Sequence, residues 1–150
     1  MKIIETKITI DAPIATVWKE LLNFSEYPNW NPFLRSISGK AEVGASLEIL
    51  ADIGRGKPMG FAPRVLKVDS EQEFRWLGHL LVRGVFDGEH YFILHALSDQ
   101  QTEFVHGEQF RGLLSPLVLK MIRADTHQGF EAMNKALKQK VESIYTTSLK

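Results

Sequence analysis

Residues 90–112, HYFILHALSDQQTEFVHGEQFRG, gather most of the side chains in this chain that could do chemistry. The segment contains three of the five histidines, and Glu108 lies two residues after His106. Imidazole and carboxylate groups are common acids and bases in enzymes, and both also bind metal ions. These residue types therefore predict an acid–base pair, a metal site, or the few polar contacts of a ligand pocket.

The same segment is typical of two antiparallel strands joined by a polar turn. With a loop at residues 99–101, Ser98 faces Thr102, and opposed residues share one face of the sheet. A slip of two residues would keep this grouping. The opposite face is more polar and should meet water. The first face is mainly apolar, should be concave, and comprises His90, Phe92, Leu94, Ala96, Phe104, His106, Glu108 and Phe110.

Two histidines and a carboxylate on an apolar face need an explanation, because an unpaired buried polar group costs about 1–3 kcal/mol. His106 and Glu108 could bond to neighbours such as Arg75 in a structural core, or orient one end of a ligand. They could also act in catalysis or bind a metal. No HExxH motif or comparable ligand spacing is present. We expect no metal and no cofactor, and keep His106 and Glu108 as the candidate catalytic residues.

The remaining sequence predicts the elements that position this hairpin. Residues 2–10 alternate as in a half-buried strand, and Asp11 and Pro13 suit the start of a short helix. YPNWNP predicts a second short helical turn. A long helix is expected from about Ser115 to Ile144. Short polar connections favour an antiparallel sheet, with six further strands at about 33–41, 45–53, 59–69, 73–79, 84–97 and 102–112.

A curved sheet must cover its apolar face, and only the C-terminal helix is large enough to do so. The two should leave a wedge-shaped space between them. Gly129, near the middle of the helix, would let a ligand or another element come close, and a packing contact is the simpler reading. The residues expected to line the space are Trp76, His90, Phe92, Leu94, Phe104, His106, Glu108, Phe110, Met121, Gly129 and Met133.

Composition excludes several classes of protein. Eighteen Lys and Arg balance eighteen Asp and Glu, whereas nucleic-acid binders usually carry a basic surplus. The absence of cysteine excludes disulfides and thiolate sites. The first residues lack the apolar core of a signal peptide, and no run approaches the roughly 20 apolar residues of a membrane helix. We expect a single cytoplasmic domain over residues 1–150, without nucleic acid or stable membrane insertion.

Several segments resemble the START/Bet v 1-like (SRPBCC) superfamily, and within it the bacterial polyketide cyclase/dehydrase-type proteins: IDAPIATVWKELLNFSEYPNWNPF, FRWLG, FDGEHYFIL, TEFVHGEQFRG and GFEAMNKALKQKVE. The resemblance extends from Ile4 to about Ile144. It implies an α+β helix-grip fold, in which a seven-stranded antiparallel curved sheet surrounds a long C-terminal helix. Two short helices lie between the first two strands. Members bind lipids, hormones, quinones, polyketide intermediates or flavonoids, and some are aromatase/cyclases.

Three functions follow as expectations. The leading one is binding of a small hydrophobic or amphipathic ligand, lipid- or polyketide-like, between the sheet and the C-terminal helix. The second is a polyketide cyclase/dehydratase-type enzyme that uses His106 and Glu108 as acid and base. The third is a protein interaction module that uses YPNWNPF and the outer face of the sheet.

Overall fold

A computed structural model describes residues 2–80 and 82–150 of the chain. The helices are α1 (Ile14–Leu21), α2 (Tyr27–Trp30) and α3 (Ser115–Ser148), with a 3-10 turn, η1 (Phe24–Glu26), before α2. The described strands are β1 (Lys2–Ile10), β2 (Leu34–Ser38), β3 (Glu48–Ala51), β4 (Met59–Phe61), β5 (Arg64–Asp69), β6 (Glu73–Leu80), β7 (Phe86–Ser98) and β8 (Gln101–Arg111).

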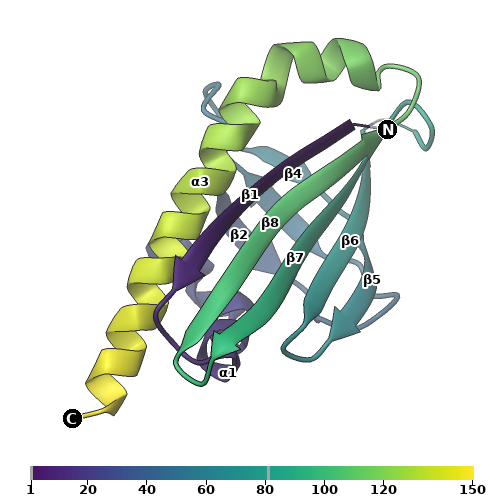
Figure 1. Cartoon of the computed structure of the whole chain (residues 1–150). Coiled ribbons are helices and arrows are strands. Elements are labelled where there is room, and N and C mark those ends of the chain that lie inside the picture. The colour runs from purple at the N-terminus through teal and green to yellow at the C-terminus, as the bar shows by residue number, and fades with distance from the viewer. Residues whose placement is uncertain (1, 81) are drawn as a thin grey trace.

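The strands form two antiparallel sheets beside α3. The larger sheet has the order β1-β8-β7-β6-β5, and the smaller has the order β2-β3-β4. In Figure 1 the smaller sheet lies behind the larger one, and α3 runs along the side next to β1. A bridge between Ser46 and Arg64 links the two sheets. A curved antiparallel sheet packed on a long C-terminal helix confirms the predicted helix-grip fold.

Two local features differ from the sequence-based expectation. The strand expected at 59–69 is divided into β4 and β5 at Ala62 and Pro63, since proline has no N–H for a continuous ladder. This division gives eight described strands where one continuous strand would have made seven. Asp11 does not cap α1: Pro13 occupies the N-cap position without a side-chain hydrogen bond. The main-chain N–H of Asp11 instead donates to Glu142 Oε2 of α3, at 2.8 Å.

Aromatic side chains fill the space between the sheet and the middle of α3. The Phe130 ring stacks on His106 with centroids 4.1 Å apart, and the Phe33 ring meets Phe130 edge-on at 5.3 Å. A Cβ at Gly129 would lie 2.6 Å from Phe33 Cδ1, so this glycine admits the Phe33 ring. The contact at Gly129 is thus one of packing. The wedge is solid around His106.

The first turns of α3 and the segment at residues 27–33 lie at the periphery of this core. Figure 1 shows the first turns of α3 bending over one end of the larger sheet. The segment YPNWNPF is divided between interior and surface: Tyr27, Asn31 and Phe33 are buried, whereas Pro28, Asn29 and Pro32 are exposed. Within residues 2–80 and 82–150, none of the helices has both the length and the apolar character to cross a bilayer.

Candidate functional site

The β7–β8 hairpin brings the predicted polar residues onto one concave face. His90 lies opposite Glu108, and Phe92 lies opposite His106. The pairing is displaced by two residues from the expected one, because Ser98 pairs with Gln101 across a shorter turn. An even displacement leaves each side chain on its predicted face. His90, His106 and Glu108 therefore do lie together.

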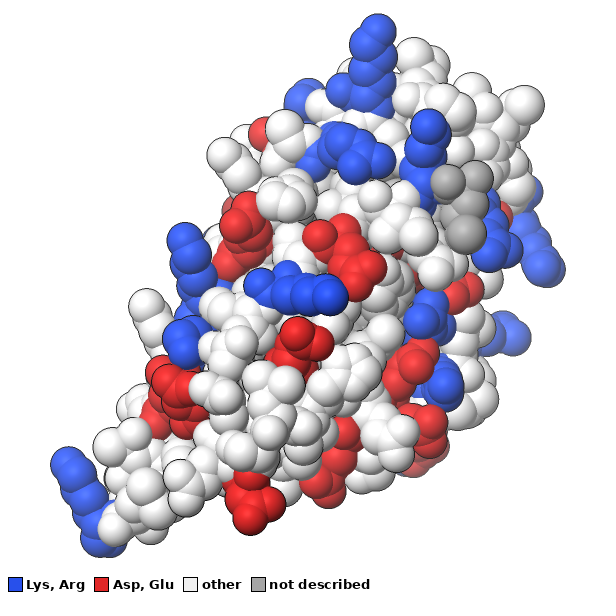
Figure 2. All heavy atoms as spheres, viewed as in Figure 1, with Lys and Arg blue, Asp and Glu red and all other residues white. Residues whose placement is uncertain are grey.

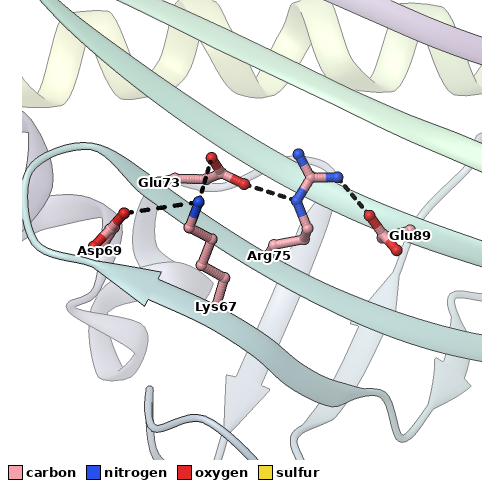
Figure 3. A network of polar contacts seen from close by, with 5 residues as sticks. All are labelled: Lys67, Asp69, Glu73, Arg75 and Glu89. Atoms are coloured by element: carbon pink, nitrogen blue, oxygen red, sulfur yellow. Dashed lines mark hydrogen bonds and ion pairs between the residues drawn. The ribbon is translucent and has the colours of Figure 1, made fainter.

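The opposite face of the larger sheet carries a network of ion pairs across β5, β6 and β7. Arg75 binds Glu73 at 2.8 Å and Glu89 at 2.6 Å, while Lys67 binds Glu73 at 3.3 Å (Figure 3). The Arg75 guanidinium also lies 4.6 Å from the ring centre of Tyr91. Arg75 therefore does not reach the concave face, where it had been considered as a partner for the buried polar groups.

A continuous chain of hydrogen bonds crosses the interior from β1 to β8. Asn134 Nδ2 donates to Thr6 Oγ1 at 2.8 Å, and Thr6 Oγ1 donates to the main-chain oxygen of His106 at 3.0 Å. Asn134 Oδ1 lies 2.9 Å from His106 Nδ1, and the Nε2 atoms of His106 and His90 are 2.7 Å apart. His90 Nδ1 lies 3.3 Å from Glu108 Oε1.

The donors in this chain determine the tautomer of each ring. Thr6 has one hydroxyl hydrogen and gives it to a carbonyl, so its oxygen accepts from the Asn134 amide and the amide oxygen faces His106. His106 Nδ1 consequently donates. Burial, reinforced by the neighbouring His90, lowers the pKa of His106 well below 6.5. The ring is therefore neutral, its Nε2 accepts, and His90 Nε2 carries a hydrogen.

The contact between His90 and Glu108 leaves the second carboxylate oxygen free to accept a hydrogen bond. Oε1 of Glu108 lies 3.3 Å from His90 Nδ1, while His90 Nε2 is bound to His106. Any hydrogen in the first contact lies between Nδ1 and Oε1, so Oε2 of Glu108 acts as an acceptor. Oε2 has no hydrogen-bond partner among the described residues.

The neighbours of this pair hold it in place. The Trp76 ring stacks on His90 with centroids 4.9 Å apart and planes 15° from parallel. Gly88 leaves room for the carboxylate, because a Cβ there would collide with Glu108 Oε2. His90 is buried, whereas the Glu108 side chain keeps 19% of its exposure. Glu108 is therefore the end of the chain of hydrogen bonds that reaches open space.

That space is a cavity of about 320 Å³ between both sheets and α3. Its wall is mainly apolar and includes Phe33, Phe61, Phe86 and Phe110. No Lys or Arg belongs to the wall within the described part of the chain. The polar members are Glu108 and His90, with His79, which is bound to Asp87, and Thr126, whose Oγ1 has no partner.

Three of the eleven predicted lining residues, His90, Glu108 and Phe110, belong to the wall of this cavity. Gly129 packs on Phe33, and Met121 is 60% exposed on the outer side of α3. Met121 was expected in the wall because it belongs to the apolar stripe of α3. That stripe is wider than the face of the helix that packs inward. The other six fill the adjoining interior and do not line the cavity: Trp76, Phe92, Leu94, Phe104, His106 and Met133.

Sequence reasoning missed fourteen of the seventeen wall residues and one key polar group. The smaller sheet contributes Leu34, Ala51 and Met59, and no local pattern indicates that this sheet faces β7 and β8. Asn134 carried a usable signal, because it is a polar residue between Met133 and Leu137 on the buried stripe of α3. An amide at such a position requires a buried partner, here His106.

The buried neutral state of His106 predicts that stability falls on acidification. Its pKa is near 6.5 in the unfolded chain and well below that in the fold, so the unfolded state binds more protons below pH 6.5. The free energy of unfolding should then decrease by up to about 1.4 kcal/mol per pH unit. His106→Gln should flatten this slope in urea unfolding between about pH 7 and about pH 5. His95→Gln, at an exposed position of the same hairpin, should not; equal slopes in the wild type and His106→Gln would contradict the assignment.

Comparison with known proteins gives a family and a fold. The family described as polyketide cyclase / dehydrase and lipid transport matches residues 1–142. A START superfamily protein from Mycobacterium smegmatis aligns over 95% of this chain and 98% of its own, with 19% identity and a TM-score of 0.74. The Zhui aromatase/cyclase from a Streptomyces species aligns over 94% and 93%, with 16% identity and a TM-score of 0.76.

A norcoclaurine synthase from Thalictrum flavum, in complex with dopamine and hydroxybenzaldehyde, aligns over 93% of this chain and 86% of its own. Its identity is 14% and its TM-score 0.70. At these identities the likeness concerns the fold alone. No curated protein sequence matches the chain at a significant level.

Proposed function

Because the chain belongs to the polyketide cyclase / dehydrase and lipid transport family, we propose that it binds a compact, largely apolar molecule in the cavity beside Glu108. The observation that carries this proposal is a mainly apolar space of about 320 Å³ whose wall holds the carboxylate oxygen Oε2 of Glu108 and the unpartnered hydroxyl of Thr126. Small-molecule sites occupy roughly 300–1,000 Å³. A volume near the lower limit favours a compound of one or two rings over an extended lipid chain.

The acceptor at Glu108 specifies the polar end of this ligand. Oε2 accepts in either protonation state of the His90–Glu108 pair, so the ligand must offer a hydroxyl or amine hydrogen. An ether or ketone oxygen there would leave Oε2 buried and unpaired, at a cost of about 1–3 kcal/mol. The norcoclaurine synthase of the same fold holds dopamine and hydroxybenzaldehyde, which are hydroxylated ring compounds. That complex supports the idea that such compounds suit a helix-grip cavity.

A naphthol is a suitable probe of this proposal, since it is a two-ring apolar compound with one hydroxyl group. Titration calorimetry should detect its binding to the wild-type protein. Ala62→Trp places a large ring at the rim of the cavity and should abolish binding. Ala132→Trp, on the exposed side of α3, is the matched control and should bind normally. Binding that survives Ala62→Trp unchanged would place the ligand elsewhere.

Arg55 should control how fast the ligand enters and leaves. Its Nε lies 2.6 Å from Asp125 Oδ2, and Nη2 donates to the main-chain oxygen of Met121. Arg55 lies in the loop between β3 and β4, close to the lining residues Ile53 and Met59. These bonds therefore hold the loop between β3 and β4 against α3 on one side of the cavity.

Removing the Arg55 side chain should accelerate the exchange of the ligand more than it changes the affinity of the cavity for the ligand. Arg55→Ala loses an exposed ion pair and one hydrogen bond, which predicts association and dissociation rates roughly three- to tenfold faster. Stopped-flow fluorescence of the naphthol measures both rates. Arg35→Ala, which breaks the exposed contact between Arg35 on β2 and Asp52, the residue after β3, is the control. Rates equal to those of the wild type would show that the loop opens independently of Arg55.

A second candidate function is acid–base catalysis on a ligand of the same class, favoured by the 3.3 Å contact between His90 Nδ1 and Glu108 Oε1. The sequence indicated His106 and Glu108 for this role, but His106 is buried behind His90 and does not line the cavity. In this reading Glu108 exchanges a proton with the substrate and His90 is its immediate partner. Glu108→Gln should then stop turnover and retain binding, and undiminished turnover would exclude the role.

A further inference from the structure

A separate surface lies at the start of α3, on the side away from the cavity. Thirteen large hydrophobic side chains are exposed in the described part of the chain, and five of them gather here. The main-chain N–H groups of Leu113 and Leu114 donate to the oxygens of Gly84 and Val85, which brings the preceding loop beside the helix. The five residues are Val82, Leu113, Leu114, Leu117 and Met121.

This face of α3 is not needed by the core. Leu114, Leu117 and Met121 follow one another at three- and four-residue spacing and so share one side of the helix. The other side carries Ser115 and Leu119, which are buried. Leu113 is 84% exposed, Leu117 61% and Met121 60%. Large aliphatic side chains are therefore presented together to the surroundings.

Positive charge surrounds these side chains. Arg83 and Lys120 are exposed beside them, Arg123 lies further round the helix with its guanidinium 3.5 Å from the main-chain oxygen of Ile3, and residues 111–124 contain no Asp or Glu. The next acidic residue, Asp125, is bound to Arg55. The whole chain is balanced at 18 basic and 18 acidic residues, so this is a local excess. Figure 2 shows Lys and Arg side chains at this end of the molecule, while most Asp and Glu lie further down.

We propose that this basic apolar face, formed by Val82, Arg83, Leu113, Leu114, Leu117, Lys120 and Met121 and bordered by Arg123, docks reversibly on anionic lipid membranes. Aliphatic side chains flanked by Lys and Arg are typical of helices that lie in the membrane interface. An acidic protein would meet the same charges, but the face lacks the Tyr and Trp side chains that dominate protein interfaces. Ile122, on the same helical turns, lines the cavity, so docking would hold the cavity beside the lipid surface.

Co-sedimentation with vesicles tests this proposal on the intact chain. The wild type should bind vesicles of equal parts phosphatidylcholine and phosphatidylglycerol, and bind phosphatidylcholine alone much more weakly. Each Lys or Arg near an anionic surface strengthens binding about fivefold, so Lys120→Glu with Arg123→Glu should weaken it at least about 25-fold. Lys135→Glu with Lys150→Glu, at exposed positions further along α3 and at its end, is the matched control and should bind like the wild type.

A fluorescent label tests the apolar half of the face without depending on stability. The chain has no cysteine, so Leu117→Cys or Ile144→Cys can each carry one environment-sensitive dye. The dye at position 117 should shift to the blue on addition of anionic vesicles, and the dye at position 144 should not. A wild-type protein that stays unbound, or equal shifts at both positions, would overturn the proposal. Unbound wild type would leave an acidic protein as the partner that fits the charges.

Discussion

Replacing Asn134 by leucine should lower the free energy of unfolding by about 2 kcal/mol. Leucine has the same number and branching of side-chain heavy atoms as asparagine, so the change removes polar atoms and leaves no hole. His106 then loses its hydrogen bond to Asn134 and keeps only the main-chain oxygen of Phe130 as a partner, which costs about 1 kcal/mol. The lost hydrogen bond to Thr6 adds about 1 kcal/mol. Urea or guanidinium unfolding at neutral pH measures the difference.

Gln139→Leu is the matched control for this prediction. It makes a comparable amide-to-leucine change on the exposed side of the same helix, where substitutions usually alter stability by less than about 0.5 kcal/mol. If Asn134→Leu proved as mild as Gln139→Leu, the Nδ1–H of His106 would not donate to Asn134 in the folded protein. The tautomer assigned to His90 would then lose its support.

Replacing Glu108 by leucine should abolish the preference of the cavity for a hydroxyl donor. The wild type should bind a naphthol about 10- to 100-fold more tightly than its methyl ether, because a hydrogen bond to a charged group is worth about 1.5–3 kcal/mol. In Glu108→Leu the acceptor is gone and the two compounds should bind alike. The methyl ether should also bind this variant better than the wild type, since no carboxylate oxygen is then left facing the ether. Calorimetric titration with each compound measures both effects.

Two further variants make this prediction specific. In Glu108→Gln the amide N–H can donate to His90 Nδ1 while the amide oxygen faces the cavity, so a reduced preference of roughly two- to tenfold should remain. Glu103→Leu, on the opposite face of β8, should behave like the wild type. A full preference for the naphthol in Glu108→Leu would show that another group recognises the hydroxyl.

The face of the hairpin was predictable because a strand has a period of two. His90, His106 and Glu108 stay together under any even shift, so the error in the turn at residues 99–101 did no harm. The long C-terminal helix was predictable from its apolar stripe and from Ser115 and Pro116 at its start. These local patterns, with the resemblance of the whole chain, were sufficient for the helix-grip fold.

The shape of the cavity was not predictable, since it depends on distances between elements far apart in the sequence. The Phe33 ring fills the space between the sheet and Gly129, whereas Phe61 and Glu108 lie on the wall of an open cavity. The apolar stripe of α3 includes both Met121 and Ile122. Of these two residues, Ile122 lines the cavity and Met121 is exposed. Such outcomes depend on how two sheets and one helix pack together, which periodicity does not encode.

The most direct test of the central claim is a crystal structure of the protein with the naphthol bound. We predict that the rings occupy the space lined by Phe33, Phe61 and Phe86. The hydroxyl oxygen should lie about 2.5–3.0 Å from Glu108 Oε2, the range of an O–H···O hydrogen bond. A naphthol seated outside this cavity, or inside it with its hydroxyl directed away from Glu108, would contradict the account.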